Sequence, residues 1–207
     1  MKSTAEKKQR SFGKLLVTAG VLLLLGAAGL FGYNQWTEYQ AGLQSEEAVT
    51  ELVTEIQNRD VATVERPDGA SKEFMKVAEL DGAYYIGVLT IPSLDRILPV
   101  QSDWSMPKLK RSPCRYSGTL TEGNLVIAGH NYRTHFTGLA RLSLGDSIIF
   151  TDLDGVQTLF EVKEIYTIDP TNIDGMVHSD YPLTLFTCNY GGKARVTVRC
   201  DRVMTED

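Results

Sequence analysis

Two strand ends in this sequence carry residues that can act together as a nucleophile and its acid–base partner. The chain contains only three cysteines and three histidines. Cys188 ends the run Leu183–Cys188 and precedes a loop with two glycines, and His130 directly follows the apolar run Leu125–Gly129. Strand ends that meet loops often carry functional side chains, and a thiol with an ordinary pKa near ~8.5 becomes reactive beside an imidazole. The pair therefore predicts covalent catalysis by a cysteine.

A third candidate lies on the run that follows this loop. Its residues alternate, so that Arg195 and Arg199 share one face and the two valines share the other face with Cys200. We interpret the valine face as core. Arg195 follows Cys188 by seven positions across a Gly-Gly loop, which places it near the start of the neighbouring strand. A guanidinium there is suited to stabilising an oxyanion or a substrate carbonyl.

The remaining cysteines and histidines have structural interpretations. An odd number of cysteines leaves at least one thiol unpaired, and we expect it to be Cys188. Cys114 and Cys200 either form a disulfide, which a location outside the cytoplasm permits, or are small buried hydrophobic residues. His135 and His178 lack the carboxylate and cysteine neighbours of a zinc site, and we expect the aspartates between positions 152 and 180 in turns and loops. No metal or other cofactor is expected.

The elements that must position these residues are β-strands. From residue 83 onward the sequence consists of short β-branched and aromatic runs separated by Gly, Pro, Asn and Asp, which is typical of an all-β barrel or sandwich. Short helices are expected at 104–110 and 136–142. The eight expected strands are Tyr84–Ile91, Arg96–Val100, Tyr116–Thr119, Asn124–Gly129, Ser147–Thr151, Val156–Ile168, Leu183–Cys188 and Ala194–Val203.

The N-terminal part has the pattern of a membrane anchor. Leu15–Tyr33 contains no charged residue and is long enough to cross a ~30 Å hydrocarbon core as a helix. Five Lys and Arg side chains precede it in residues 1–14, and Tyr33 and Trp36 lie at its far end. The positive-inside rule then predicts a cytoplasmic N-terminus and an extracytoplasmic segment 34–207. The alternative is a cleaved signal peptide, but the apolar run continues past its small residues to Phe31.

Between the span and the β domain we expect a helical extension, residues 34–82. Val49, Leu52, Val53 and Ile56 recur at three- and four-residue steps and form one apolar stripe that can pack on the following domain. Residues 60–71 contain Pro-Asp-Gly and are predicted as a loop. A second short helix is expected at 72–80, and the β domain is expected at 83–207.

Charge excludes one class of partner. The formal net charge is −5, although the first fourteen residues are basic, so the rest of the chain is acidic. Binding to nucleic acid requires clustered lysine and arginine side chains. The sequence shows no such cluster beyond the tail, and nucleic acid is therefore not expected as a partner.

Three motifs resemble the sortase family of Gram-positive cysteine transpeptidases. The LTLFTC run of Leu183–Cys188 is similar to the family's Thr-Leu-x-Thr-Cys signature, NLVIAGH ends at the catalytic histidine position, and RVTVR matches the arginine strand. The resemblance covers roughly Tyr84–Val203 and implies an eight-stranded β-barrel with short helices. It also implies that Cys188 is the nucleophile, His130 the general acid/base and Arg195 the electrostatic stabiliser, with Arg199 as runner-up.

The resemblance implies an activity and its partners. Cys188 would cleave the C-terminal sorting signal of a surface protein through a thioester, and a primary amine of a cell-wall precursor or a pilin would resolve it. Arg195 and the backbone N–H that follows Cys188 would stabilise the oxyanion. Whether the resting pair is neutral or a thiolate–imidazolium stays open.

The subclass and two other functions also stay open. The helical extension resembles class B sortases, yet the stretch between Ile168 and Leu183 is too short for the additional helix that those enzymes carry there. The Asp-Pro-aromatic lid tripeptide of pilus-assembling enzymes does not occur between Asn34 and Tyr84, which favours wall anchoring over pilus assembly. An L,D-transpeptidase also uses Cys, His and Arg, but its cysteine typically follows Ser-x-Gly, and Cys188 does not. The third possibility is a membrane-tethered, peptide-binding β module without activity.

Overall fold

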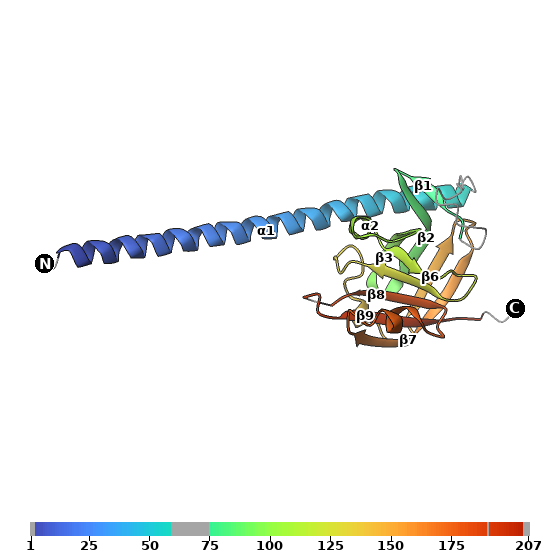
Figure 1. Cartoon of the computed structure of the whole chain (residues 1–207). Helices are drawn as coiled ribbons and strands as arrows, with labels where there is room; N and C mark the ends of the chain where they lie inside the picture. Colours follow the sequence, from blue (N-terminus) through green and yellow to red (C-terminus); the bar gives the residue numbers. More distant parts are fainter. Residues whose placement is uncertain (1–2, 59–74, 190, 205–207) are drawn as a thin grey trace. The chain divides into compact units, whose positions relative to one another are not determined.

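The β domain of the computed structural model is a closed barrel built from one sheet (Figure 1). The structure describes residues 3–58, 75–189 and 191–204. Within them the strand order is β1-β2-β3-β4-β5-β8-β9-β7-β6, and pairing of β2 with β6 closes the sheet. β2 to β9 thus form an eight-stranded barrel, and β1 pairs with the first residues of β2.

The strands are β1 (Ala78–Leu80), β2 (Ala83–Ile91), β3 (Arg96–Gln101), β4 (Cys114–Ser117), β5 (Leu125–Gly129), β6 (Ser147–Asp152), β7 (Gln157–Ile168), β8 (Leu183–Cys188) and β9 (Arg195–Arg202). The helices are α1 (Ser3–Asn58), η1 (Pro92–Leu94), α2 (Met106–Arg111), η2 (Leu139–Arg141) and α3 (Ile173–Val177).

The expected mainly β barrel is confirmed, and all eight predicted strands are present. β8 has the predicted bounds, Leu183–Cys188. The largest difference is β4, which begins at Cys114 because this residue pairs with Ala128 of β5. The helices α2 and η2 overlap the two short helices expected from the sequence.

The short helix predicted at 72–80 is wrong in its described part. Ala78–Leu80 forms β1, antiparallel to β2, with Ala78 opposite Tyr85. A three-residue strand is too short to display its own periodicity, so its conformation is decided by pairing and by burial of Ala78 and Leu80 against a neighbouring helix. Residues 72–74 and the predicted loop 60–71 lie outside the described residues.

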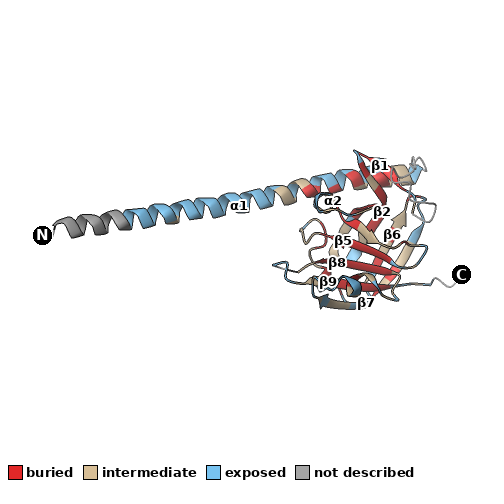
Figure 2. Cartoon of the chain, in the orientation of Figure 1, coloured by how far each residue is buried: buried red, intermediate tan, exposed pale blue. Residues whose placement is uncertain are grey.

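The barrel interior is the main hydrophobic core. It contains Phe136, Phe150 and Phe160 together with aliphatic residues from most of the strands. The valine face of β9 points into this core, as its alternation predicts, and Cys200 is buried with it. Buried residues are concentrated on β2, β5, β8 and β9, as Figure 2 shows.

The chain divides into two compact units, and the boundary between them, after Tyr39, falls within helix α1. The first unit ends at Tyr39 and the second begins at Gln40. In the first unit the helix is long and apolar enough to cross a membrane, and none of its most apolar stretch is buried. In the second unit the helix packs on the β domain. Leu52 is fully buried there, and Val53 and Ile56 are partly buried beside it, as the apolar stripe predicted.

Candidate functional site

Strand register brings the two strand ends that carry Cys188 and His130 together. β5 and β8 are parallel neighbours, and Gly129 lies opposite Thr187. The next residue of each strand is therefore His130 and Cys188. Because the strands are parallel, both side chains emerge at the same edge of the sheet.

A buried hydrogen bond ties these two strand ends to each other. The hydroxyl of Thr187, a residue that is only 3% exposed, donates to the carbonyl oxygen of Gly129 at 2.8 Å. The bond joins side chain to backbone and lies one residue before each of the two candidates. It therefore limits how far Cys188 and His130 can move apart.

Arg195 reaches the same edge through the next strand. β8 and β9 are antiparallel, and Cys188 lies opposite Arg195. The connection turns through Gly191 and Gly192, whose φ angles of 91° and 72° favour glycine. Among the described residues, the Arg195 guanidinium makes only long contacts, of 3.4 and 3.5 Å, with backbone carbonyls of this loop. Such contacts are weak, and its donors remain accessible to a bound group.

The backbone N–H after Cys188, which the resemblance implies as a second oxyanion donor, is hydrogen-bonded within its own loop in the structure. The N–H of Asn189 donates to the carbonyl oxygen of Ala194 at 2.8 Å, and the Asn189 side chain accepts from the Ala194 N–H at 3.0 Å. These reciprocal bonds close the loop between β8 and β9. Because this N–H is already paired, the Arg195 guanidinium is the candidate oxyanion donor at the described part of this edge.

The environment of His130 favours a neutral imidazole. Its ring stacks on Tyr132 at 4.7 Å between centroids, and its Nε2 atom is buried without a hydrogen-bond partner. Burial lowers the pKa of His130 below its ordinary value of 6.5, and the charge of Lys110 lowers it further. A neutral ring nitrogen beside a thiol can accept its proton.

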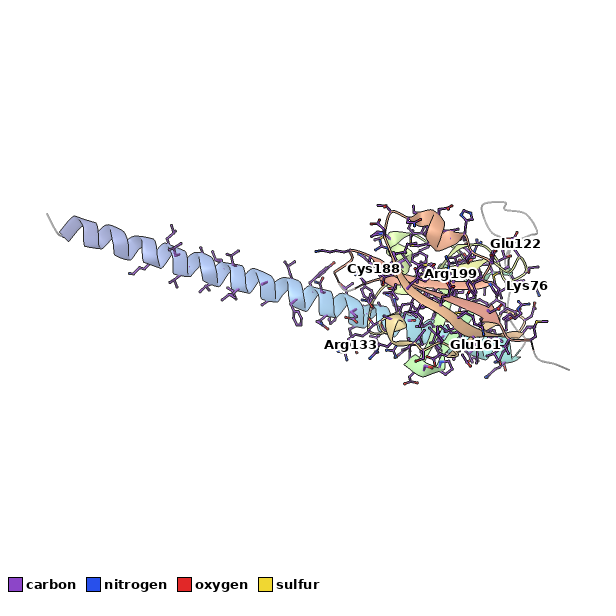
Figure 3. The ribbon with its side chains drawn as sticks, turned by 90° about the horizontal axis from the view of Figure 1, so that it is seen from below. Lys76, Glu122, Arg133, Glu161, Cys188 and Arg199 are labelled. Carbon is purple, nitrogen blue, oxygen red and sulfur yellow. The ribbon has the colours of Figure 1, made fainter. Side chains whose placement is uncertain are left out.

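The three candidate residues line one cavity of about 240 Å³. Figure 3 shows Cys188 near one end of the barrel, with Arg199 farther along the sheet. Its lining residues come mainly from β5 and β8, from the segment around α2, here called the α2 wall, and from the segment around α3, here called the α3 wall. The further lining residues are Trp104, Met106, Leu109, Tyr116, Ala128, Gly129, Pro170, Ile173, Met176, Phe186 and Thr187. A larger cleft of about 410 Å³ lies between the end of α1 and strands β2 and β6, but no described cysteine or histidine lines it.

An aromatic cluster makes this cavity mostly apolar. Trp104 stacks on Tyr116 at 5.0 Å, and Tyr116 meets Phe186 edge to face at 5.2 Å. The sequence analysis did not identify these lining residues. For Phe186 the signal was available, because residues of β8 alternate and Phe186 must face away from the core residue Leu185. A cavity of this kind suits an apolar peptide segment better than a charged one.

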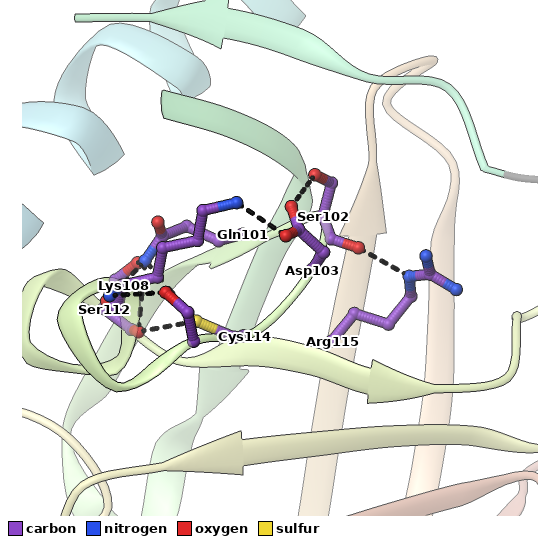
Figure 4. Close-up of polar contacts among 8 residues, drawn as sticks. Gln101, Ser102, Asp103, Lys108, Ser112, Cys114 and Arg115 are labelled. Atoms are coloured by element: carbon purple, nitrogen blue, oxygen red, sulfur yellow. Dashed lines mark hydrogen bonds and ion pairs between the residues drawn. The ribbon is translucent and has the colours of Figure 1, made fainter. Parts of the chain in front are cut away.

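A polar network holds the α2 wall in place (Figure 4). The side-chain amide of Gln101, at the end of β3, donates to the Lys108 carbonyl at 2.8 Å and to the Ser112 hydroxyl at 2.9 Å. Lys108 in turn forms an ion pair with Asp103 at 2.6 Å. Gln101 is 1% exposed, and its bond to the Ser112 hydroxyl is shielded from water. The network ties Lys108, within a helix that is only six residues long, and Ser112, which directly follows it, to the end of β3.

The structure separates Arg195 from its runner-up. Arg199 lies on the same face of β9, but α3 covers it and leaves it 2% exposed. It does not line the cavity, and its guanidinium donates to the carbonyl oxygens of Gly175 and Met176. Of the two arginines, only Arg195 lines the cavity together with Cys188 and His130.

The other cysteines and histidines lie away from the cavity lining. Cys114 and Cys200 are buried free thiols in the structure, and burial raises the pKa of each to about 12. Burial also lowers the pKa of His135 to about 4, and the charge of His130 contributes to this shift. His178 is exposed and pairs with Asp174 at 2.6 Å. Within residues 3–58, 75–189 and 191–204, no group of three or more His, Cys, Asp or Glu side chains is arranged to hold a metal ion.

Comparison with known proteins identifies the family. Residues 89–203, more than half of the chain, match the sortase domain model. The fold is similar to a Clostridium perfringens sortase D5 transpeptidase, with a TM-score of 0.58 and 20% identity over 78% of this chain and 99% of that chain. It is also similar to sortase C from C. perfringens SM101, with a TM-score of 0.52 and 24% identity over 77% and 91% of the two chains. Sortase C-1 from Actinomyces oris has a TM-score of 0.51 and 25% identity over 57% and 73%. No curated protein sequence matches the chain. The family match and the shared barrel confirm the resemblance seen in the three motifs, and the chain belongs to the sortase family.

Proposed function

We propose that this sortase is a cysteine transpeptidase in which Cys188, His130 and Arg195 carry the reaction. The observation that supports this most strongly is their convergence: strand register brings all three to one edge of the sheet, where they line one apolar cavity. A nucleophile, a neutral base and a cation are the groups that acyl transfer through a thioester needs.

In the first half-reaction Cys188 attacks a peptide carbonyl carbon of the substrate. His130 takes the thiol proton, the Cys188 Sγ–C bond forms, and Arg195 donates hydrogen bonds to the developing oxyanion. The C–N bond then breaks, and the imidazolium gives its proton to the leaving nitrogen, which leaves a thioester on Cys188. The lowered pKa of His130 suits this sequence, because a neutral ring accepts the first proton and the resulting imidazolium is a strong acid for the second step.

In the second half-reaction a primary amine resolves the thioester. The amine nitrogen attacks the thioester carbon and gives a proton to His130, a new amide bond forms, and Cys188 recovers its proton as it leaves. The net reaction exchanges one amine for another at the same acyl group. Transfer to an amine of a cell-wall precursor, or of a pilin, anchors the acyl donor covalently.

The proposed acyl donor is a surface protein with a C-terminal sorting motif. The cavity supports this, since its aromatic and methionine lining suits the apolar residues that precede a scissile bond. Sortase C of C. perfringens, a neighbour in fold with 24% identity and a TM-score of 0.53, has been solved with the C-terminal cell wall sorting motif.

We place the enzyme in the cell membrane, with residues 1–14 in the cytoplasm, 15–33 as the span, and the extension 34–82 and barrel 83–207 outside. The apolar first part of α1 and the basic residues before it support this orientation. An anchored enzyme would meet surface proteins as they leave the membrane.

Product analysis tests the proposal. The full chain in detergent is incubated with peptides of the Leu-Pro-x-Thr-Gly and Asn-Pro-x-Thr types together with small primary amines, and products are measured by mass. We expect one peptide class to give both a cleaved fragment and an amine adduct. The Cys188→Ala and His130→Ala variants should give neither, while His178→Ala, an exposed control, should retain activity. Adduct formation by Cys188→Ala would refute the assignment.

A further inference from the structure

Arg199 is a buried cation that the proposed reaction does not use. It is 2% exposed. Its Nε donates to the Tyr166 hydroxyl at 3.0 Å, its Nη1 to the Met176 carbonyl at 3.2 Å and to the Thr184 hydroxyl, and its Nη2 to the Gly175 carbonyl at 2.7 Å. Among the described residues, it has no carboxylate partner within salt-bridge distance. Its partners are therefore neutral oxygens contributed by β7, β8 and α3.

Two of these oxygens belong to the end of α3. The last carbonyl groups of a helix have no intrahelical N–H partner, and a buried end must find donors elsewhere. The His178 N–H donates to the Asp174 carbonyl oxygen. Arg199 donates to the next two carbonyl oxygens, those of Gly175 and Met176. A cation also interacts favourably with the negative end of a helix. Arg199 thus caps the C-terminus of α3 from the sheet beneath it.

Helix α3 depends on stabilising contacts from outside the helix. It has five residues, and so short a helix is not stable by itself in water. At its N-terminus the Asn172 side chain accepts from the Gly175 N–H at 2.9 Å, and Gly175 is packed so closely that a Cβ would come within 2.6 Å of Ile168. The Tyr166 hydroxyl adds a long contact of 3.4 Å to the Gly175 carbonyl.

α3 is also one wall of the cavity that contains Cys188. Ile173 and Met176 line it from α3, and Met106 and Leu109 line it from α2. The width of the cavity therefore depends on where α3 sits. Because the Met176 carbonyl is bound by Arg199 while its side chain lines the cavity, the position of this wall is linked to the guanidinium.

We propose that Arg199 is a positioning residue that sets substrate selectivity, by fixing α3 as the wall that recognises the apolar residue of the acyl donor. The inference rests on the proposed function. Arg199 touches neither Cys188 nor the cavity, so it acts on the affinity and fit of the peptide and not on the chemical step.

Selectivity kinetics with the full chain test this role. The variants are Arg199→Lys, which keeps the charge but not the planar fork, and the milder Tyr166→Phe; Arg202→Lys, an exposed position on the same strand, is the control. Each enzyme is assayed with two peptides that carry Leu or Ala at the apolar position before the proline. We expect Arg199→Lys to raise KM and to reduce the Leu-to-Ala ratio of kcat/KM by roughly tenfold, the scale set by a few methylene contacts. Tyr166→Phe should change KM and the Leu-to-Ala ratio in the same directions but by smaller factors. Arg202→Lys should leave both KM and the ratio unchanged.

Two further measurements separate selectivity from general damage. The rate at which iodoacetamide labels Cys188, and kcat at saturating Leu peptide, should stay within about twofold of wild type in Arg199→Lys, because the catalytic residues are not displaced. Hydrogen exchange should increase in 173–177 and not in β8.

Each outcome bears on one of the two claims. Unchanged exchange in 173–177, an unchanged Leu-to-Ala ratio, or a fall in kcat and thiol labelling at constant KM overturns the role of Arg199. A wild-type enzyme that forms no product with either peptide instead refutes the proposed function, and the selectivity role with it.

Discussion

Replacing Thr187 by valine removes the hydrogen bond that joins the two strand ends of the site. The bond from the Thr187 hydroxyl to the Gly129 carbonyl is 2.8 Å long and buried, and valine keeps the shape of the side chain. Removing one partner of a buried hydrogen bond costs about 1–3 kcal/mol. For a domain of this size each kcal/mol lowers Tm by about 2–4 °C, which predicts a fall of roughly 2–12 °C.

Thr197 provides a matched control with the opposite sign. It lies on β9, is fully buried, and its hydroxyl has no hydrogen-bond partner in the structure. Thr197→Val exchanges an unpaired buried hydroxyl for a methyl group, so its free energy of unfolding should be unchanged or higher. Thermal unfolding of both variants in detergent, followed by near-ultraviolet circular dichroism, measures the difference. Equal Tm values for the two variants would refute this account of how Gly129 and Thr187 are held.

Two other variants and one test of membrane topology give further predictions. Arg195→Lys should lower turnover by about 10²–10³-fold, because an ammonium does not reproduce the guanidinium's directed donors to the oxyanion; near wild-type turnover would remove Arg195 from the mechanism. His135 should lower the free energy of unfolding in acid, because its pKa is 6.5 in the unfolded chain and about 4 in the folded one. Its contribution to stability is complete above pH 6.5 and falls by about 1.4 kcal/mol per pH unit as the pH drops toward 4. His135→Gln should flatten this slope in urea titrations at several pH values. Protease added to intact protoplasts should digest 34–207 and leave a membrane fragment that contains 15–33, whereas release of mature protein into the medium would indicate a cleaved signal.

The strands could be predicted because their pattern is local and strong. β8 carries a run of Leu, Thr and Phe between Pro182 and Asn189, and its observed bounds are those predicted from the sequence. The alternation on β9 likewise assigned Val196 and Val198 to the core. β1 could not be predicted in this way, because three residues show no period and their conformation depends on pairing with β2.

The surroundings of the site depended on contacts that a linear sequence does not display. In the sequence of β9, Arg195 and Arg199 occupy equivalent polar positions on the same face of the strand. In the structure, however, α3 covers Arg199 and does not cover Arg195. α3 itself was not predicted, because five residues carry no helical periodicity and part of its stabilisation comes from Arg199. Asn172, a residue type favoured at helix N-caps, was the one local signal for it.

The choice between a disulfide and two buried thiols was also a question of tertiary structure. Cys200 faces the barrel core, whereas Cys114 lies beside Gln101 and Ser112 at the α2 network and donates to the Ser112 carbonyl at 3.4 Å (Figure 4). Both are unpaired in the structure. Because both thiols have a pKa raised to about 12, they should react slowly with alkylating reagents. Cys188 is the half-exposed thiol of the three.

The most direct test of the central claim is to trap the thioester. The full chain is incubated with its best peptide substrate in the absence of an amine, and the reaction is quenched in acid. The masses of the intact protein and of its proteolytic fragments are then measured by mass spectrometry. The account predicts a mass increase equal to the acyl part of the peptide, located on the fragment that contains Cys188, absent from Cys188→Ala, and lost when an amine is added before the quench. Product formation without an adduct, or an adduct on Cys114 or Cys200, would contradict it.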